Sequence, residues 1–358
     1  MSLYGQVRST VMPGRDARSP LYHKEFTMEH YIAVGLDVGS TELVGVIATP
    51  DGTHHPVRVP NTPAGHTTLL QRLTASPHPV RVGLEATGVY HLEVAMRLHA
   101  HPDITLCVAN PRTARDFARA HSPRAKTDTT DAQALLAFVQ HMPFTPWTPP
   151  APALQALQAL ARRIDALTAM QTQEKNRRHA LDRLPARCPA LTRDSTRHLA
   201  YLARSITRLR QAAVDLITAH PTLHARFRQL CSIPGIATAS AIPLLAELAP
   251  LPPAMTVRQW VAHAGLDPRP HTSGTSVHKR PRISKVGNAH IRRALYMPAL
   301  VAAHRDPHLH AFYQRLLARG KAKRQALTAV MRKLLHAIYG LYKHQAYYNG
   351  ARLCPQTP

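Results

Sequence analysis

The chain of 358 residues is long enough for two or three modest domains, each able to bury a core of its own. Its 45 Lys and Arg residues stand against 20 acidic ones, and the formal net charge of +25 predicts a polyanionic partner, nucleic acid above all. The sequence has no apolar run that could span a bilayer and no Cys-x-x-Cys pair, which argues against a membrane protein, a zinc ribbon and a disulfide framework and favours a reducing cytoplasm.

Residues 1–28 carry Gly, Pro, Ser and scattered charge without apolar periodicity, so we expect a disordered extension there. The first buried strand is predicted over 31–36 and ends in Asp37. A second strand is predicted over 43–48, before a turn at 50–52. These two strands should form a hairpin with an acid at the end of its first strand.

A third apolar segment, 79–84, leads to Glu85, and a helix is predicted over 90–98. A further strand is predicted over 104–109. This order predicts a mixed α/β layer in which polar residues gather at the strand ends.

Asp128 and Asp131 stand three residues apart at the start of an apolar helical segment, so both carboxylates can face one side. Two-metal phosphoryl chemistry needs several carboxylates that converge on ions about 3.5–4 Å apart. Each acid alone has an ordinary explanation: Asp37 as a turn cap, Glu85 as a surface ion pair, Asp128 as a helix N-cap and Asp131 as a residue favoured by the helix dipole. Their joint placement in a chain with few acids favours a site for Mg²⁺ or Mn²⁺.

The segment from Gly35 to Thr41 also resembles the first phosphate loop of the sugar-kinase and actin superfamily, in which Asp37 would serve ATP. That function needs a second glycine-rich phosphate loop and a glycine-rich adenosine site. The sequence shows neither among its 16 glycines. ATP binding therefore stays the less favoured alternative.

The proline-rich residues 143–152 predict a linker, because proline removes donors and fixes the backbone. Beyond it Leu and Ile recur at helical spacing on both sides of the prolines at 185–189, which predicts an antiparallel coiled-coil hairpin over 153–222. Its outward face carries many arginines, and a solvated face and a nucleic-acid or subunit contact are equally open. The Ile233–Ile236 turn resembles a helix-hairpin-helix that presents N–H groups to phosphate, with a purely structural turn as the alternative because Ala237 replaces the usual second glycine.

The polar, glycine-marked region 264–293 is where we expect a nucleophile that attacks phosphate. Ser273 stands beside Gly274 and is followed by cations that would stabilise the developing charge. On chemistry alone Ser276 and Ser284 are equal candidates. Basic residues expected to contact nucleic acid, here and elsewhere, are Arg112, Arg115, Lys126, Lys279, Arg280, Arg282, Lys285, Arg292, Arg293, Lys321, Lys323, Arg324, Arg332 and Lys333.

Short motifs stand in a fixed order between about Tyr31 and Tyr347: Gly-Leu-Asp37, Glu85-Ala-Thr-Gly, Asn110-Pro-Arg, Lys126-Thr-Asp128-x-x-Asp131-Ala, Ile233-Pro-Gly-Ile, Ala264-Gly-Leu-x-Pro, Ser273-Gly and Ile283-Ser-Lys-x-Gly-Asn288. This combination resembles the "one-ten" family of insertion-sequence transposases, which includes the pilin-inversion invertases. One departure is Gly39-Ser-Thr41, where family members often carry Ser-Lys. Any contact made by that lysine is not expected here.

The resemblance implies a ribonuclease-H-like (RuvC-like) α/β domain over 29–142, the linker, the all-α coiled-coil hairpin, a mainly α serine transposase domain over 223–347 and a tail over 348–358. Four acids would hold the divalent metal and a serine would become joined to a DNA 5′-phosphate. Carried over residue by residue, these are Asp37, Glu85, Asp128, Asp131 and Ser273.

The same resemblance implies partners: donor and target DNA, a structured bridge RNA that pairs with both, and a tetramer, a dimer of dimers, in which the acids of one subunit meet the serine of another. The function expected is that of a transposase or site-specific recombinase acting in the cytoplasm. The alternative is a RuvC-like DNA endonuclease, which would use metal-activated water and leave no covalent adduct.

Overall fold

The computed structural model describes residues 31–86, 88–121, 127–185, 188–273 and 277–353, and for His121 and residues 270–273 and 277–281 it describes the backbone alone. The chain forms two compact units that divide between Pro149 and Pro150. Among the described residues, no helix combines the length and the apolar character needed to cross a bilayer.

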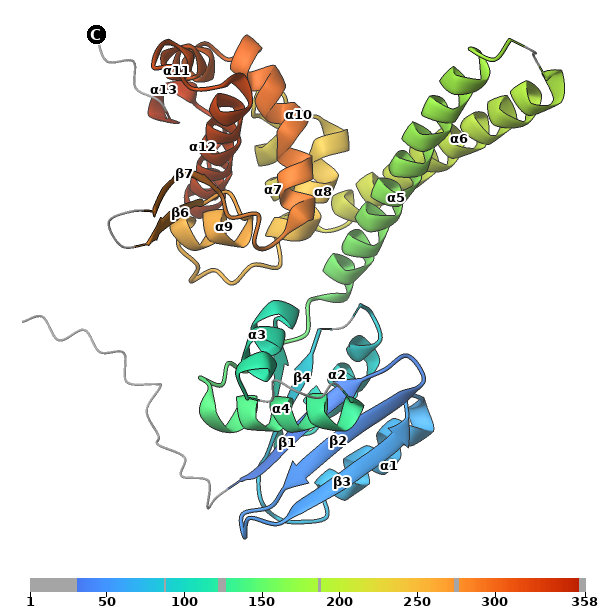
Figure 1. Cartoon of the computed structure of the whole chain (residues 1–358), viewed down its shortest axis with the longest axis vertical. Helices are drawn as coiled ribbons and strands as arrows, with labels where there is room; N and C mark the ends of the chain where they lie inside the picture. Colours follow the sequence, from blue (N-terminus) through green and yellow to red (C-terminus); the bar gives the residue numbers. More distant parts are fainter. Residues whose placement is uncertain (1–30, 87, 122–126, 186–187, 274–276, 354–358) are drawn as a thin grey trace, which may run out of the picture. The chain divides into compact units, whose positions relative to one another are not determined.

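A mixed five-stranded sheet forms the centre of the first unit (Figure 1). Its strands are β1 (Ile32–Val38), β2 (Glu42–Ala48), β3 (His54–Pro60), β4 (Val80–Glu85) and β5 (Ile104–Ala109), in the order β3-β2-β1-β4-β5. The β2 strand is antiparallel to β1 and β3, whereas β1, β4 and β5 run parallel. The carboxyl ends of the three parallel strands therefore meet at one edge of the sheet.

Helices cover both faces of this sheet (Figure 1). They are α1 (Pro63–Leu73) and α2 (His91–His99) on one face, and α3 (Pro111–His121) and α4 (Asp128–His141) on the other. The central strands are buried on both faces, which explains why β1 and β4 read as continuous apolar runs in the sequence.

The sequence patterns predicted β1, β2, β4, α2, β5 and α4 but not β3, α1 and α3. On β3 only Val57 and Val59 are buried, an alternation too short to be recognised between prolines and histidines. The start of α1 does carry a signal, because the Thr62 side chain accepts a hydrogen bond from Gly65 N and Pro63 occupies the first turn.

Both margins of the sheet are covered or interrupted. At the β5 margin, Trp147 from the proline-rich segment donates its backbone N–H to the Leu106 carbonyl, with an N···O distance of 2.6 Å. At the β3 margin, Pro56 and Pro60 lack backbone N–H groups and Arg58 is exposed. The segment that the sequence presents as a linker is therefore partly packed against the first unit.

The second unit is mainly helical. Its helices are α5 (Pro152–Leu181), α6 (Pro189–Thr218), α7 (Pro221–Cys231), α8 (Thr238–Leu248), α9 (Val257–His263), α10 (Ala289–Arg305), α11 (Pro307–Ala318), α12 (Lys323–His344) and α13 (Gly350–Leu353). The long helices α5 and α6 pack against each other as the expected hairpin (Figure 1). An antiparallel two-stranded ribbon, β6 (Pro268–Ser273) and β7 (Val277–Ile283), was not predicted, because its strands carry few apolar residues.

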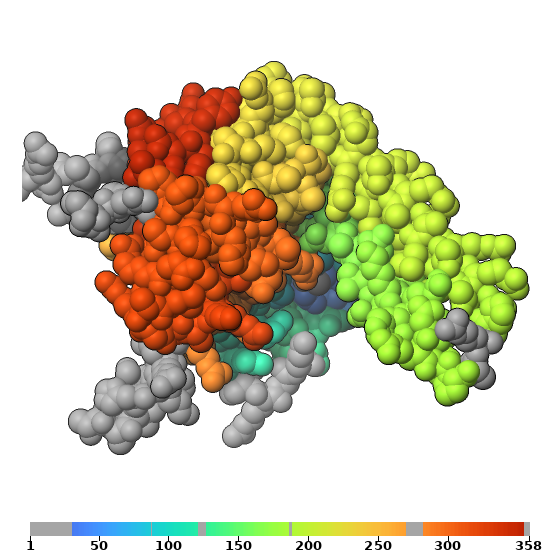
Figure 2. All heavy atoms as spheres, turned by 90° about the horizontal axis from the view of Figure 1, so that it is seen from above, coloured from blue at the N-terminus to red at the C-terminus, as the bar shows by residue number. Residues whose placement is uncertain are grey.

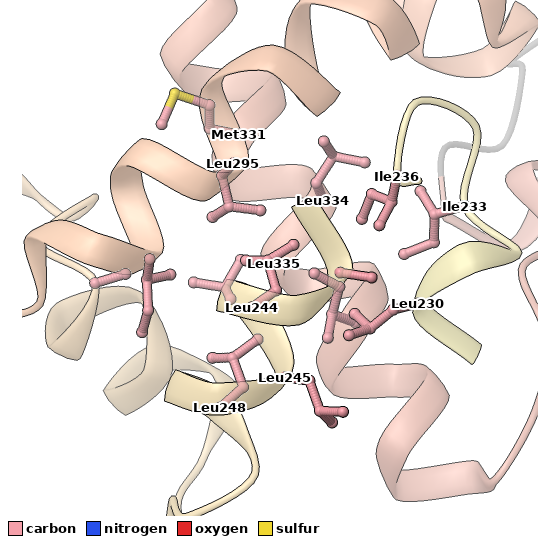
Figure 3. Close-up of a cluster of buried hydrophobic side chains, with 14 of the residues drawn as sticks. Leu230, Ile233, Ile236, Leu244, Leu245, Leu248, Leu295, Met331, Leu334 and Leu335 are labelled. Atoms are coloured by element: carbon pink, nitrogen blue, oxygen red, sulfur yellow. The ribbon is translucent and has the colours of Figure 1, made fainter. Parts of the chain in front are cut away.

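The core of the second unit forms around α8, which is buried on nearly every side. Leu244, Leu245 and Leu248 of α8 lie among Leu295 of α10 and Leu335 of α12 (Figure 3). In the space-filling view the residues of α7 and α8 (yellow) adjoin those of α10 and α11 (orange) in one continuous surface (Figure 2).

Candidate active site

Two of the expected acids stand at neighbouring positions on the sheet. Leu36 of β1 pairs with Leu84 of the parallel strand β4. Asp37 and Glu85 are the next residues, so they lie side by side at the carboxyl ends of the two strands. Since side chains alternate along a strand, both acids are on the face opposite to that on which Leu36 and Leu84 are buried. That is the face covered by α4.

A glycine lets α4 approach this face closely. A Cβ atom on Gly35 would lie 2.2 Å from both the Ala132 carbonyl oxygen and Leu136 N. No real side chain tolerates such contacts, so the helix backbone lies directly on β1. On the adjoining strand a Cβ atom on Gly83 would lie 2.2 Å from Val139 Cγ2.

The direction of α4 brings its first turn to the edge that carries the acids. Phe144 follows the end of α4, and the Arg81 guanidinium lies 5.2 Å from the centre of its ring and 4.5 Å from that of Tyr31. Tyr31 and Arg81 are at the amino ends of β1 and β4, so α4 ends there and begins at the carboxyl ends. Asp128 and Asp131 therefore belong to the same edge and face as the other two acids.

The start of α4 shows that Asp128 is not the N-cap of this helix, which was the ordinary explanation for this residue. The N-cap of the helix is Thr127, whose Oγ1 accepts a hydrogen bond from Thr130 N, while Thr130 Oγ1 accepts one from Thr127 N. This reciprocal cap satisfies the first backbone donors without a carboxylate. Asp128 is exposed and Asp131 is half-buried. Neither carboxyl group is needed to begin the helix.

The four acids suit a hard divalent ion by their chemistry, because carboxylate oxygens are the ligands that Mg²⁺ and Mn²⁺ prefer. In the described parts of the chain, however, no three His, Cys, Asp or Glu side chains form a group that could hold a metal ion. The backbone thus brings the acids to one edge, while their carboxylates do not converge on one point.

Ser273 belongs to the second unit, at the end of β6, where its backbone pairs with Val277 of β7. Residues 274–276, which include Ser276, lie outside the described residues, as do the side chains of Ser273, Lys279 and Arg280. The expected nucleophile is therefore placed by its backbone, at the end of the β6–β7 ribbon that is farther from α9 and α10.

The base of this ribbon is fixed by several hydrogen bonds. Ser284 Oγ donates to Asp267 Oδ1 at 2.5 Å, and Ser284 N donates to the Asp267 carbonyl at 2.9 Å. Next to them, Lys285 N donates to the Gly265 carbonyl at 3.1 Å. The motifs around 264–268 and 283–288 are thus joined to each other by hydrogen bonds. Ser284, an alternative nucleophile by sequence, is engaged in this contact.

A buried carboxylate ties the next helix to the core. Glu247 of α8 is 6% exposed and accepts a hydrogen bond from Asn288 Nδ2 at 2.6 Å. Asn288 is in turn the N-cap of α10, with its Oδ1 accepting from His290 N at 2.8 Å. Arg162 of α5 lies 3.6 Å from the same Glu247 carboxylate. These contacts fix the start of α10 directly after the ribbon.

The expected nucleic-acid contacts differ in what they already bind. Arg292 is half-buried, and its guanidinium donates to the Ala264 carbonyl at 2.8 Å, which is a structural contact; burial lowers the pKa of this guanidinium. Arg293 pairs with Asp165 at 3.4 Å, and Arg112 pairs with Asp116 at 3.5 Å.

The remaining basic residues fall into three groups. Arg115, Arg282, Lys285, Lys321, Lys323 and Arg324 are exposed. Arg332 and Lys333 are half-buried, and the Lys333 ammonium lies 5.5 Å from the centre of the Phe312 ring. Lys126 and the side chains of Lys279 and Arg280 lie outside the described part of the chain. The exposed group retains the freedom to meet a phosphate backbone.

The turn at Ile233–Ile236 is built into the core. Ile233 and Ile236 are 1% and 4% exposed, and a Cβ atom on Gly235 would lie 2.7 Å from the Pro298 carbonyl oxygen of α10. The turn therefore joins α7 and α8 against α10, as in the structural alternative to a phosphate-binding hairpin.

The motif at Asn110 also has a structural cause, because Asn110 Oδ1 accepts a hydrogen bond from Arg112 N at 2.9 Å at the start of α3.

Sequence reasoning missed several residues near the acidic edge. Val89 and Tyr90, shortly after Glu85, are 64% and 51% exposed. Asn61, between the end of β3 and the start of α1, contacts the loops that follow the acids, and His66 of α1 contacts Asn61. The only available signals were a polar residue beside a proline-capped helix and an exposed aromatic, and neither is specific.

Two family models match the chain. Residues 34–184 match a model for the DEDD transposase of IS110, described as a transposase, and residues 227–314 match one described as "Transposase IS116/IS110/IS902 family". The first match contains all four acids and the second contains Ser273.

The chain is also similar to curated proteins. It is 31% identical over 270 residues to the pilin gene-inverting protein of Moraxella bovis, covering 73% of this chain and 79% of that protein. It is 29% identical over 150 residues to an uncharacterized 43.6 kDa protein of insertion element IS110 from Streptomyces coelicolor, covering 41% of this chain and 37% of that protein. A third relative is an uncharacterized 42 kDa protein of insertion element IS900 from Mycobacterium paratuberculosis, 28% identical over 197 residues, 53% of this chain and 47% of that protein.

Proposed function

This chain belongs to the IS110 family of transposases and is a DNA transposase or recombinase; we propose that it cuts and rejoins DNA through a covalent bond between Ser273 and a DNA 5′-phosphate. The observation that carries the proposal is the shared position of Asp37, Glu85, Asp128 and Asp131 at one edge and on one face of the sheet. This arrangement, in a sheet proposed to be RuvC-like, suits a site that positions a phosphate.

The four acids would hold Mg²⁺ or Mn²⁺ in this proposal. A bound divalent ion supplies charge stabilisation at the phosphoryl oxygens and helps a hydroxyl to lose its proton. The acids' own part would be to fix the ion at this edge of the sheet, between the carboxyl ends of β1 and β4 and the first turn of α4.

Ser273 would act as the nucleophile. Its Oγ would form a bond to phosphorus while the bond from phosphorus to the 3′-oxygen breaks, and a 3′-hydroxyl would be released. A 3′-hydroxyl of another strand would then attack the phosphoserine and restore the serine hydroxyl. The number of phosphoester bonds is unchanged, so the cycle needs no external energy source.

The partners extend the same proposal. The net charge of +25 and the exposed Lys and Arg side chains suit contacts to phosphate backbones. The family resemblance supports a structured bridge RNA beside donor and target DNA, and a tetramer in which acids and serine come from different subunits. The relatives that are named as inverting pilin genes support rearrangement of DNA as the reaction, which we place in the cytoplasm.

The nucleophile can be tested with a pair of serine variants. Ser273→Ala should abolish the protein–DNA adduct that denaturing electrophoresis detects with end-labelled DNA, because the proposal assigns the attack on phosphorus to the Ser273 hydroxyl. Ser284→Ala is the matched control: its hydroxyl is engaged with Asp267, so the variant should lose stability but still form the adduct.

The opposite results would identify other chemistry. An adduct that persists in Ser273→Ala and disappears in Ser284→Ala would assign the nucleophile to Ser284. Metal-dependent cleavage by the wild-type chain without any adduct would indicate an endonuclease that uses water.

A further inference from the structure

Asn61 connects the two loops that follow the acids Asp37 and Glu85. Its side-chain Nδ2 donates a hydrogen bond of 2.8 Å to the carbonyl of Gly39 and lies 3.4 Å from the carbonyl of Tyr90. Its backbone N–H also donates to the Thr41 carbonyl at 2.9 Å. One residue outside both loops therefore holds the turn between β1 and β2 and reaches the start of α2.

The orientation of this amide is set by a buried histidine. His66 is 1% exposed, and its Nε2 lies 2.7 Å from Asn61 Oδ1. Because Asn61 uses Nδ2 to donate to Gly39, its Oδ1 is the acceptor and His66 Nε2 is the donor. Burial is the main reason that the pKa of His66 is lowered, which favours the neutral ring.

The energetics indicate a specific role for this pair. Burying an imidazole is costly unless it is hydrogen-bonded, and the hydrogen bond that His66 makes is the one that orients Asn61. Metal sites depend on such outer contacts, because the ligands of a metal must be held within roughly 0.5 Å of the productive geometry. Gly39 is two residues from Asp37, and Tyr90 is five residues from Glu85.

We propose that Asn61, oriented by His66, is a positioning residue that ties the loop after Asp37 to the loop after Glu85 and so limits how far the two acids can separate when they bind a divalent cation. This inference rests on the proposed metal-binding role of the acids. Asn61 does not touch the ion or the DNA and acts through the backbone of the two loops.

The first experiment measures Mn²⁺ binding to the full chain without nucleic acid, by electron paramagnetic resonance of the free ion. Asn61→Ala should weaken binding by about 10-fold or more, the range seen for outer contacts of metal ligands. Thr62→Ala is the matched control. It removes the N-cap of α1, at a cost of about 1 kcal/mol, but contacts neither loop, so its Mn²⁺ affinity should stay at the wild-type value.

A histidine pair tests the same inference if Asn61→Ala does not fold. His66→Gln keeps an N–H that can donate to Asn61 Oδ1 and should retain wild-type Mn²⁺ affinity. His66→Leu fills the buried space without a donor and should weaken binding as Asn61→Ala does. The inference would be overturned if His66→Gln and His66→Leu changed the Mn²⁺ affinity equally, or if Asn61→Ala and Thr62→Ala did. Either result would show that the contact contributes only to the general stability of the fold.

Asp37→Ala separates this inference from the proposed function. If Asp37→Ala loses Mn²⁺ and Asn61→Ala binds it like the wild type, the positioning role is wrong and the metal site stands. If Asp37→Ala binds like the wild type, or the wild-type chain binds no Mn²⁺ at millimolar concentration, the assignment of the metal ligands fails and the inference fails with it.

Discussion

At position 35 the distance between a helix and a strand depends on a single missing atom. The Cβ of any other residue would lie 2.2 Å from backbone atoms of Ala132 and Leu136, and backbone cannot move aside as a flexible side chain can. The same approach brings the first turn of α4, with its two acids, to the ends of β1 and β4. Packing and the proposed metal site are therefore linked at this one residue.

Gly35→Ala should displace α4 and destabilise the first unit by about 1–3 kcal/mol or more, the usual cost of overpacking. Metal binding should weaken as well, because Asp128 and Asp131 would move with the helix. Chemical denaturation and Mn²⁺ titration measure the two effects. Gly340→Ala is the control, since a Cβ there meets nothing within 4 Å and alanine favours the helix. Wild-type stability of Gly35→Ala would contradict the close contact.

Two half-buried histidines give the second unit an expected pH dependence. Burial is the main cause that lowers the pKa of His263 and of His336 below the ordinary value of 6.5, and the Glu247 charge partly opposes this at His263. The unfolded chain then binds more protons than the native chain below about pH 6.5, so stability should fall as the pH drops through this range.

Tryptophan fluorescence can measure this fall. The chain has two tryptophans, so Trp147→Phe leaves Trp260 as the reporter of the second unit. The denaturation midpoint should decrease between about pH 7 and about pH 5. Replacing His263 or His336 with Gln should reduce that decrease, and an unchanged decrease in both variants would assign it to other groups.

At the scale of elements, the sequence predicts a strand or helix well where one environment covers its whole length. The buried strands β1 and β4 and the long helices α5 and α6 have continuous apolar runs or clear helical periodicity. The acids Asp37 and Glu85 were found because they end such runs. The β6–β7 ribbon and β3 were missed, since too few of their side chains are apolar for a period to be seen.

The candidate site could likewise be predicted only where its residues end a regular pattern in the sequence. The residue types and their positions at two strand ends and one helix start indicated the four acids as candidates, but the approach of α4 depends on Gly35 and on contacts between distant segments. Asn61 and His66 could not be found, because a single polar contact leaves no repeating pattern. On chemistry alone Ser273 and Ser284 were equal candidates, and the family resemblance, not the pattern, favoured Ser273; the hydrogen bond of Ser284 to Asp267 could not be read from the sequence.

The burial of α8 indicates that the second unit is most sensitive to smaller side chains in this helix. Leu244 is 0% exposed in the core that α8 shares with α10 and α12, so Leu244→Ala should cost about 2–5 kcal/mol through reduced burial and a cavity. The Trp260 signal reports the change in midpoint. Met170→Ala, on an exposed part of α5, should change it little. Similar decreases in both variants would argue against this core.

At the scale of the whole molecule, the acids belong to the first unit and Ser273 to the second. The two proposed halves of the chemistry therefore have separate cores, so a mutation can disable one without unfolding the other. The strong positive charge belongs almost entirely to the second unit, where 32 Lys and Arg residues stand against 8 acidic ones, compared with 13 against 12 in the first unit. It should govern affinity for nucleic acid more than any single contact.

Salt titrations can measure this contribution. Replacing Lys321, Lys323 and Arg324, which are exposed at the start of α12, with alanine should weaken DNA or RNA binding without sequence preference. The slope of the logarithm of affinity against the logarithm of salt concentration should become shallower by about one for each phosphate that the variant no longer neutralises. Lys175→Ala, on an exposed part of α5, provides a comparison. An unchanged slope in the triple variant would show that this cluster does not meet phosphate.

The protected margins of the sheet have a consequence for folding during synthesis of the chain. The backbone of residue 147 occupies one margin at Leu106, and prolines interrupt the other along β3. Neither rim offers an unbroken ladder to which a neighbouring chain could add a strand. Once residue 147 has emerged from the ribosome, the first unit can complete its sheet and resist fibrous aggregation while the longer remainder is still being synthesised.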